Sequence, residues 1–263
     1  MSSPRQSRDE AAIRVRGMAV NYPHGHALPL HDHDWAQLIY ASQGVMSVHT
    51  EAGAWVVPAH RAVWVPAGVR HRIAMSGAVA MRTLYLDPSL ACAAPAHCTV
   101  VNVSPLLREL VLRAVEIAPL YETEPAHARL IGVLVDELES LRVVPLRVPA
   151  PRDPRARRAA EWLRSHPGDG AVLERVARSA GASKRTLERL FLRETGMSLG
   201  AWREQMRLMR SLELLARGDS VTEVALSVGY ASTSAFIARF RRVLGTTPGR
   251  YYANESSGLH ASM

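Results

Sequence analysis

The sequence predicts a two-domain α+β protein, in which a β-barrel and a helical hairpin are followed by an all-α domain. Three observations support this prediction. At 263 residues, the chain exceeds the usual size of one domain. Glycine and proline interrupt short apolar runs up to residue 88, whereas helical periodicity begins at Ser104. A proline-rich stretch at 143–154 then marks a boundary between the two domains.

The first domain is predicted to be a sensor β-barrel over residues 13–98. Its apolar runs often alternate with polar residues, as strands do when they bury one face. Turn residues separate the runs at intervals of roughly 8–12 residues, a rhythm typical of sandwiches and barrels. The predicted strands are Ala36–Ala41, Gly44–Thr50, Trp55–Val57, Ala62–Val65 and Ala80–Leu86. The polar, Arg-rich residues 1–12 are predicted to be a disordered tail.

A helical hairpin is predicted over residues 99–143. Ser104 suits an N-cap and Pro105 suits the first helical position, so one helix is expected over Ser104–Pro119. A second apolar stripe predicts a helix over Ala126–Arg142. Wide apolar stripes need a partner surface, so the two helices cover the barrel, pair in a homodimer, or do both.

Residues 144–153 are predicted to form a semi-rigid linker, because Val143–Pro154 holds four prolines and shows no periodicity. The all-α domain follows over residues 154–252, and residues 253–263 are predicted to be a tail. Glycines separate its candidate helices, as they do at helix C-termini. These helices are Pro154–His166, Ala171–Ser179, Lys184–Thr195, Leu199–Arg217, Val221–Val228 and Ser232–Leu244.

The positive charge of the chain, formally +8, lies in the C-terminal domain. Residues 1–151 hold 13 arginines and 13 acidic residues, whereas residues 152–252 hold 18 arginines and one lysine against 10 acidic residues. A basic domain beside a neutral one predicts a polyanionic partner for the basic domain. No apolar run is long enough for a membrane span and no secretory signal is visible, so a cytoplasmic protein is expected.

The C-terminal domain contains an internal repeat. Val176–Ser198 resembles Val224–Thr247 at an offset of 48 residues before the turn and 49 after it. Each copy reads as a short helix, a turn with a glycine and a longer helix, which is the helix-turn-helix layout. Gly181 and Gly229 occupy the turns, where a positive φ is needed.

One face of each second helix is predicted to contact DNA. In the first copy this face carries Lys184, Arg185, Thr186, Glu188 and Arg189; in the second it carries Ser232, Thr233, Ser234, Ile237, Ala238 and Arg241. These residue types bind base edges and phosphates. The helix between the copies, Leu199–Arg217, should be about 28 Å long. Such a helix is able to hold two recognition helices roughly one duplex turn, about 34 Å, apart.

These two segments resemble the DNA-binding domain of AraC/XylS-type bacterial transcription regulators. The resemblance covers residues 153–252 and is carried by Leu173–Gly200 and Val221–Tyr251. It implies that Arg185, Thr186 and Arg189 contact bases and phosphates in the first copy. It also implies that Thr233, Ser234 and Ala238 take those places in the second copy. Ala238 departs from the family, which often has arginine there, so the second copy is expected to contribute more to phosphate and shape recognition.

The first domain resembles a cupin barrel. His31-x-His33-x3-Gln37-x6-Gly44 is followed by Pro66-x-Gly68-x2-His71, and seven of the eleven histidines lie between His24 and His71. In the cupin motifs, two histidines, a glutamate and a later histidine bind a divalent metal. Here Gln37 replaces the glutamate. The resemblance therefore makes His31, His33, Gln37 and His71 candidate ligands for zinc, nickel or iron.

Two uses of these histidines remain open at this point. They form a metal site, or they line a pocket for a small-molecule effector. The predicted pocket residues are His31, His33, Gln37, Tyr40, Trp64 and His71. The favoured function is a sequence-specific transcription regulator that binds promoter DNA, senses a small-molecule effector and forms a homodimer, with RNA polymerase as a further partner. The alternative is a metal-dependent cupin enzyme or a metal sensor with an appended DNA-binding domain. Asp32 and Asp34 alternate with the histidines and should point away from them, so no enzyme is expected.

Overall fold

The structure, a computed structural model, describes residues 12–91, 94–168 and 172–257. The chain divides into two compact units, one containing residues 57–146 and the other containing residues 51–56 and 147 onward. Strands up to Thr50 belong to the first unit. All of the tail predicted at 1–12 except Ala12 lies outside the described residues, as do residues 258–263. Within the described ranges, none of the helices has the length and apolar character that a transmembrane span needs.

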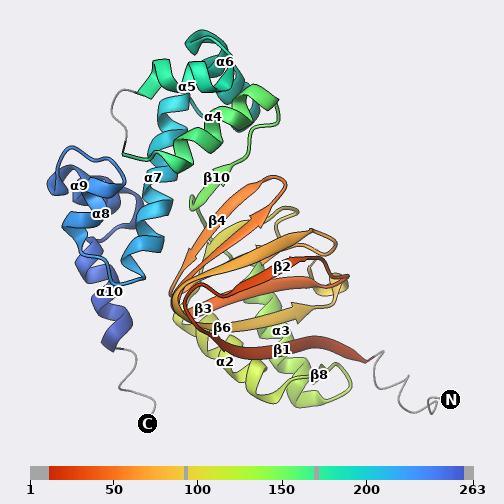
Figure 1. Cartoon of the computed structure of the whole chain (residues 1–263). Helices are drawn as coiled ribbons and strands as arrows, with labels where there is room; N and C mark the ends of the chain where they lie inside the picture. The colour runs from red at the N-terminus through yellow and green to blue at the C-terminus, as the bar shows by residue number, and fades with distance from the viewer. Residues whose placement is uncertain (1–11, 92–93, 169–171, 258–263) are drawn as a thin grey trace. The chain divides into compact units, whose positions relative to one another are not determined.

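The strands form an antiparallel sheet that curves around a common interior (Figure 1). Hydrogen bonding gives the order β8-β1-β6-β3-β5-β7-β9; β2 also pairs with β6, and β4 pairs with β10. The curved sheet agrees with the β-barrel predicted from the turn spacing, and it is cupin-like, as the resemblance of the histidine motifs implies. The strands are β1 Ile13–Tyr22, β2 Ala27–His31, β3 Ala36–Thr50, β4 Gly53–Pro58, β5 Arg61–Val65, β6 His71–Leu86, β7 Thr99–Asn102, β8 Leu120–Tyr121, β9 Val143–Val144 and β10 Arg147–Pro149.

Strand β3 is longer than the sequence predicts. The runs Ala36–Ala41 and Gly44–Thr50 form one strand, β3, whose register against β6 shifts on either side of Gln43. Gly44 has φ +76° within this irregularity. A Cβ on Gly44 would lie 2.3 Å from the carbonyl oxygen of Ala78, so the close approach of β6 also requires glycine. The glycine here permits a β-bulge and does not end the strand.

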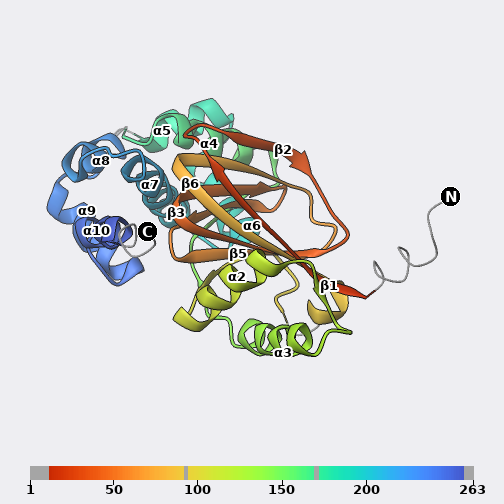
Figure 2. The same ribbon diagram turned by 90° about the horizontal axis from the view of Figure 1, so that it is seen from below.

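Helices α2 (Pro105–Ile117) and α3 (Pro125–Glu139) cover one face of the sheet (Figure 2). Ser104 caps α2: its Oγ accepts a hydrogen bond from the Leu107 backbone N–H and donates one to Glu137 of α3. The apolar faces of both helices pack on the sheet, and each buried leucine contributes about 1.5–3 kcal/mol. The buried helix residues are Leu107, Val111, Ala114, Ile131, Leu134 and Leu138.

The structure corrects the boundaries of the predicted hairpin and linker. Thr99–Asn102, predicted to begin the hairpin, forms β7 and pairs with β5. The predicted linker 144–153 is not a free extended segment, because Val144 lies in β9 and Arg147–Pro149 forms β10. Both strands make non-local ladders, which a local proline count does not reveal. β10 pairs with β4, and the Trp202 indole Nε1 donates to the Pro149 carbonyl at 2.8 Å.

The second unit contains the helices predicted from the glycine spacing. They are α4 (Pro154–Ser165), α5 (Val172–Ala180), α6 (Lys184–Thr195), α7 (Leu199–Leu215), α8 (Val221–Ser227) and α9 (Thr233–Leu244). A further helix, α10 (Pro248–Ser257), follows. Residues 253–257 therefore belong to a helix and not to the predicted tail. Pro248 at the first turn supplies the fixed φ that favours a helix start.

Glu194, near the end of α6, anchors the start of α4 and should make this domain sensitive to acid. Its carboxylate accepts hydrogen bonds from the backbone N–H groups of Arg152 (2.8 Å) and Asp153 (2.9 Å). The bond from Asp153, with one from Arg193, holds the pKa of Glu194 below its ordinary value of 4.5. A lowered pKa adds stability above pH 4.5 that is lost as the pH falls through the folded-state value. We expect Glu194→Gln to flatten the loss of unfolding free energy below pH 5, measured by denaturation across pH.

The matched control for this prediction is Glu161→Gln, which changes an exposed glutamate of α4. That variant should keep the pH dependence of the wild-type chain. Asp153 adds to the same acid sensitivity, because its hydrogen bonds from Arg155 lower its pKa to about 2. Equal slopes for wild type and Glu194→Gln between pH 5 and pH 2 would contradict the anchoring role of Glu194.

Candidate DNA-binding surface and ligand site

Helices α5 and α6 form the first helix-turn-helix unit. Gly181 in the turn has φ +62°, and the Ala182 N–H donates to the Ala177 carbonyl at 3.1 Å. The Ser183 hydroxyl caps α6 by accepting from the Thr186 N–H. Leu187, Leu190 and Phe191 are buried on one side of α6. The helix therefore packs by one face and leaves the other for a partner.

The outward face of α6 carries the predicted DNA-contact residues. Lys184, Arg185 and Arg189 are exposed, whereas Thr186 and Glu188 are half-buried. A groove of about 610 Å³ runs beside the helix. Its lining residues are Arg185, Thr186, Glu188, Arg189, Leu192 and Ser198. Leu192, with 60% of its surface exposed, is absent from the sequence prediction. The sequence did contain a signal for Leu192, because this leucine lies outside the apolar stripe of Leu187, Leu190 and Phe191.

Glu188 has a structural contact besides its place on this face. Its Oε2 accepts a hydrogen bond from the Leu199 N–H at 3.1 Å. Leu199 is the first residue of α7, where backbone N–H groups lack helical partners. Glu188 therefore links α6 to the start of α7. The negative charge of its carboxylate is stabilised by the positive end of the α7 dipole.

The second helix-turn-helix copy, formed by α8 and α9, repeats the same turn. Gly229 has φ +88°, and the Tyr230 N–H donates to the Ala225 carbonyl at 2.9 Å, which matches the Ala182–Ala177 bond of the first copy. Ser232 lies just before α9 and caps it by accepting from the Ala235 N–H. The buried face of α9 presents Phe236 and Phe240.

The predicted contact residues of α9 include fewer cations than those of α6. Ser234, Ala238 and Arg241 are exposed, and Thr233 and Ile237 are half-buried. Arg241 is the cation among these residues, whereas the face of α6 has three. The structure thus brings both predicted sets of residues to helix surfaces. Arg242, also exposed on α9, adds a second cation beside the set of that helix.

Helix α7 connects the two helix-turn-helix copies, which lie towards its opposite ends (Figure 1). It has 17 residues and is about 26 Å long at 1.5 Å per residue. Its buried residues include Trp202, Leu208 and Leu212, so it packs along much of its length. A packed helix is a stiff spacer between the two recognition helices.

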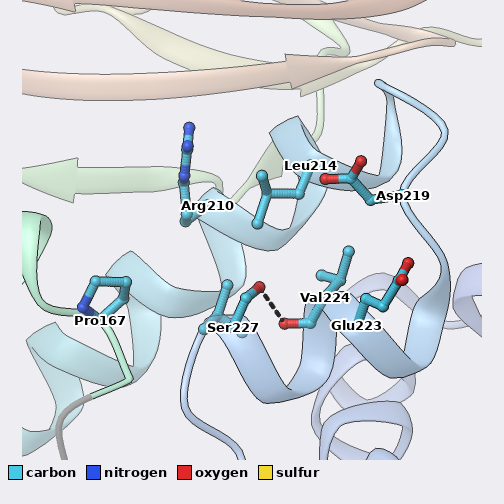
Figure 3. A pocket seen from close by; sticks show the side chains of 8 residues that line it. Pro167, Arg210, Leu214, Asp219, Glu223, Val224 and Ser227 are labelled. Atoms are coloured by element: carbon cyan, nitrogen blue, oxygen red, sulfur yellow. Dashed lines mark hydrogen bonds between the residues drawn. The ribbon is translucent and has the colours of Figure 1, made fainter.

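A hollow of about 490 Å³ lies between α7 and α8 (Figure 3). It is lined by Pro167, Arg210, Leu214, Asp219, Glu223, Val224, Ser227 and Val228. Arg210 is 2.7 Å from Glu213, and the Glu223 carboxylate accepts from the Ser220 N–H and hydroxyl. Acidic groups flank the arginine, so this hollow does not attract phosphate and lies outside the candidate DNA surface.

Inside the sheet of the first unit, three of the predicted histidines meet. One ring nitrogen each from His31, His33 and His71 lies within 4.8 Å of the others. The ring centroids of His31 and His71 are 4.3 Å apart, and those of His33 and His71 are 5.2 Å apart. His71 is fully buried, whereas His31 and His33 are half-buried. Burial, with a smaller effect of the neighbouring imidazoles, lowers the pKa of His71 and favours its neutral form.

Gln37 joins this cluster through a hydrogen-bonded chain. Its Oε1 lies 2.9 Å from His33 Nε2, and its Nε2 donates to Thr83 Oγ1 at 2.9 Å. The ring of Tyr85 meets His33 edge to face at 5.2 Å. Thr83 and Tyr85 are absent from the sequence prediction, although they alternate with apolar Leu84 and Leu86 along one strand. This alternation places Thr83 and Tyr85 on one face of the strand, whereas the pairing of Gln37 with Tyr85 depends on the register.

Two predicted pocket residues lie elsewhere. Tyr40 and Trp64 belong to the core cluster that packs under α2 and α3. Gln37 and Tyr40 are three residues apart on β3, so their side chains leave opposite faces of the sheet. Trp64 pairs with Leu38, which shares the face of Tyr40, and its indole donates to the Pro95 carbonyl. Neither aromatic residue lines the histidine cluster.

The donor set of the cluster fits a divalent transition metal. Imidazole nitrogen suits zinc, nickel and iron, and three such ligands leave an open coordination position. The Nε2 atom of His71 is buried without a hydrogen-bond partner among the described residues. Such an unpaired nitrogen is expected where the ring binds a cation. His31, His33 and His71 would hold such an ion, with Gln37 beside it.

Comparisons with known proteins agree with both units. A model of the AraC-like ligand binding domain matches residues 18–199, and a model of a helix-turn-helix domain matches residues 176–254. The HTH-type transcriptional regulator NimR of Escherichia coli is 38% identical over 225 residues, which are 86% of this chain and 82% of NimR. RipA of Corynebacterium glutamicum is 43% identical over 104 residues, 40% of this chain and 31% of RipA.

Among solved structures, ToxT of Vibrio cholerae aligns over 90% of this chain and 94% of its own, with 11% identity and a TM-score of 0.39. The curated relatives are described as transcriptional regulators. The NimR match spans both units, and the two family models cover the sheet domain and both helix-turn-helix copies. The chain therefore belongs to the AraC family of helix-turn-helix transcriptional regulators, with an AraC-like ligand-binding domain preceding its DNA-binding domain.

Proposed function

We propose that this regulator binds promoter DNA by placing α6 and α9 in two successive major grooves. The observation that carries the proposal is the exposed cationic face of α6, with Lys184, Arg185 and Arg189, opposite a buried face. Arginine forms paired hydrogen bonds with guanine, and lysine binds phosphate as a point charge. Helix α6 is assigned most of the base reading. Helix α9, with Ser234, Ala238 and Arg241, is assigned phosphate and shape recognition.

The spacing of the two recognition helices gives a direct test. A footprint of the full-length chain on its selected operator should show two protected segments one helical turn apart. Inserting five base pairs between them moves one segment to the opposite face of the duplex, and a stiff α7 cannot follow. We expect the affinity to fall at least about 30-fold, whereas a full-turn insertion loses less. Equal affinity for all spacings would contradict the proposal.

A homodimer formed through α2 and α3 is part of this proposal. Leu106 on α2 is 51% exposed and Val133 on α3 is 40% exposed, although both helices already bury another face against the sheet. Exposed apolar side chains on neighbouring helices favour a protein partner. An identical chain fits this role, because the relevant surface is then self-complementary about a two-fold axis.

Replacing Leu106 and Val133 together by glutamate should convert the dimer to a monomer, because charges are depleted from interface cores. Sedimentation velocity of the full-length chain measures the change, and the dissociation constant should rise at least about tenfold. Leu226→Glu is the matched control, since Leu226 on α8 is 58% exposed and lies in the other unit. An unchanged dimer in the double variant would place the interface elsewhere.

A small-molecule effector is the second ligand of this proposal. Members of the AraC family bind DNA and such effectors. The interior cluster of His31, His33, Gln37 and His71 is the site that supports effector binding best, because it groups polar side chains inside an otherwise apolar sheet. Effector binding changes DNA affinity only as far as the effector prefers one conformational state over another.

A further inference from the structure

The hydrogen bonds of the histidine cluster fix which nitrogens face its centre. The Nδ1 atom of His31 lies 2.8 Å from the Pro29 carbonyl, that of His71 lies 2.8 Å from the Val69 carbonyl, and that of His33 lies 2.5 Å from the Trp35 carbonyl. A carbonyl oxygen only accepts, so each Nδ1 carries a proton and donates it. In the neutral ring, Nε2 then keeps its lone pair. Hydrogen bonds from Nδ1 to a backbone carbonyl orient imidazoles that bind a metal through Nε2.

The contact between His33 and Gln37 calls for a cation. Thr83 Oγ1 donates to the Leu38 carbonyl, so it accepts from the Gln37 amide, which turns the Gln37 Oε1 towards His33 Nε2. Two lone pairs 2.9 Å apart repel each other unless a positive charge lies with them. A proton on His33 Nε2 meets this need, and so does a metal ion. The metal ion also supplies a partner for the buried Nε2 of His71.

We propose that His31, His33 and His71 bind one divalent transition-metal ion through their Nε2 atoms, and that this ion binds the effector, a small anion, at its open position. The inference rests on the proposed regulatory function and names the chemical class of its effector. The donor atoms lie up to 4.8 Å apart, wider than the roughly 3.3 Å between nitrogens of a tetrahedral zinc site. His31 and His33 are half-buried, so their side chains have room to close on the ion.

The charge of the loaded site selects an anion. Three imidazoles and an amide are neutral, so the ion keeps its charge of two. In the described part of the chain, no carboxylate joins the metal-ligand cluster. Asp32 and Asp34 are exposed, and Asp32 lies 3.8 Å from Arg70. A charge inside the sheet that lacks a counter-charge is costly. An anionic ligand at the open position removes this cost, and a neutral ligand does not.

Cobalt titration of the full-length chain tests the proposal. The chain is prepared without a histidine tag, stripped of metal and titrated with Co²⁺, whose visible d–d bands report its ligands. We expect one equivalent to bind with the intense bands of a four- or five-coordinate ion, and acetate or azide to shift those bands. His71→Ala and His71→Gln should each weaken Co²⁺ binding at least about 100-fold, beyond the cost of losing an outer-sphere partner. His26→Ala, an exposed histidine outside the cluster, should leave binding unchanged.

A gain-of-binding variant guards against loss through misfolding. Gln37→Glu places a carboxylate beside the ion, so Co²⁺ should bind more tightly and acetate should no longer shift the bands. Absence of stoichiometric Co²⁺ binding, or equal binding by wild type and both His71 variants, overturns the metal site. Bands that ignore acetate and azide in the wild-type chain overturn the anionic effector.

The same preparations separate this inference from the proposed function. Operator footprints are recorded with and without Co²⁺ and acetate. A normal footprint in a chain that binds no Co²⁺ rejects the metal site and leaves DNA binding intact. Metal binding without any footprint rejects the proposed function. The complete proposal requires that acetate changes the operator affinity only when Co²⁺ is present. It also requires that Gln37→Glu abolishes this change.

Discussion

Replacing both Arg185 and Arg189 by alanine is expected to abolish operator recognition while the chain remains folded. Both side chains are exposed on α6, and neither forms a hydrogen bond or ion pair with any residue that the structure describes. Their removal therefore leaves no buried group unpaired. Loss of a base-reading arginine costs about 1–3 kcal/mol, or about 5- to 150-fold in affinity for each one. Binding isotherms on the operator and on unrelated DNA, with a thermal melt, measure both parts of the prediction.

The control is a variant that loses the same charge from another surface. Arg16 on β1 and Arg142, which follows α3, are exposed in the sheet domain outside both helices of the proposed dimer interface. Arg16→Ala with Arg142→Ala should therefore leave the operator affinity almost unchanged. Arg185→Lys separates the two roles of an arginine, because lysine keeps the charge but lacks the planar fork that binds guanine. A lysine variant with full specificity would place Arg185 on phosphate. Wild-type footprints from the double alanine variant would remove α6 from the DNA surface.

Local signals were sufficient for the helices that carry this surface. The bounds predicted for α6, Lys184–Thr195, are those of the structure. Ser183 caps its start and Gly196, with φ +71°, ends it, so both boundaries are encoded within the segment. The period of 48 residues gave the second unit in the same way. Charge on the recognition face is likewise a property of the helix period and needs no tertiary information.

Non-local pairing explains what the sequence did not reveal. β10 has the composition of a linker, and only its ladder with β4 makes it a strand. The pocket residues show the same limit. Residue type grouped Tyr40 and Trp64 with the histidines, whereas strand parity places them on the opposite face with Leu38. Parity was available from the sequence, but the partners of Gln37, which are Thr83 and Tyr85, depend on strand register.

Gly229→Ala is expected to destabilise the second helix-turn-helix unit by about 4 kcal/mol. Gly229 has φ +88°, which costs an alanine about 1–2 kcal/mol. The added Cβ would also lie 2.6 Å from the Pro167 carbonyl oxygen and 2.7 Å from the Gly168 Cα. Both are backbone atoms that cannot rotate away, so the segments must separate. Hydrogen exchange of the full-length chain, followed in peptides from α7 to α9, measures the loss of stability.

The internal repeat supplies the control. Gly181 is the equivalent residue of the first copy and has φ +62°, but a Cβ there meets only the end of the Arg158 side chain, at 3.6 Å. Gly181→Ala should therefore lower the stability only by the cost of the backbone conformation, about 1–2 kcal/mol. Similar losses for the two variants would mean that the contact with Pro167 does not constrain the second turn.

The difference between the two glycines has a consequence for DNA recognition. Arg207 is 7% exposed, and its Nε donates to the Pro167 carbonyl at 2.9 Å. The second turn thus packs on the segment after α4, and this packing sets the direction in which α9 leaves the turn. In Gly229→Ala, the operator segment read by α9 should lose protection while the segment read by α6 keeps it. If both segments lose protection together, α7 does not hold the two units independently, and recognition by each helix depends on the fold of the whole domain.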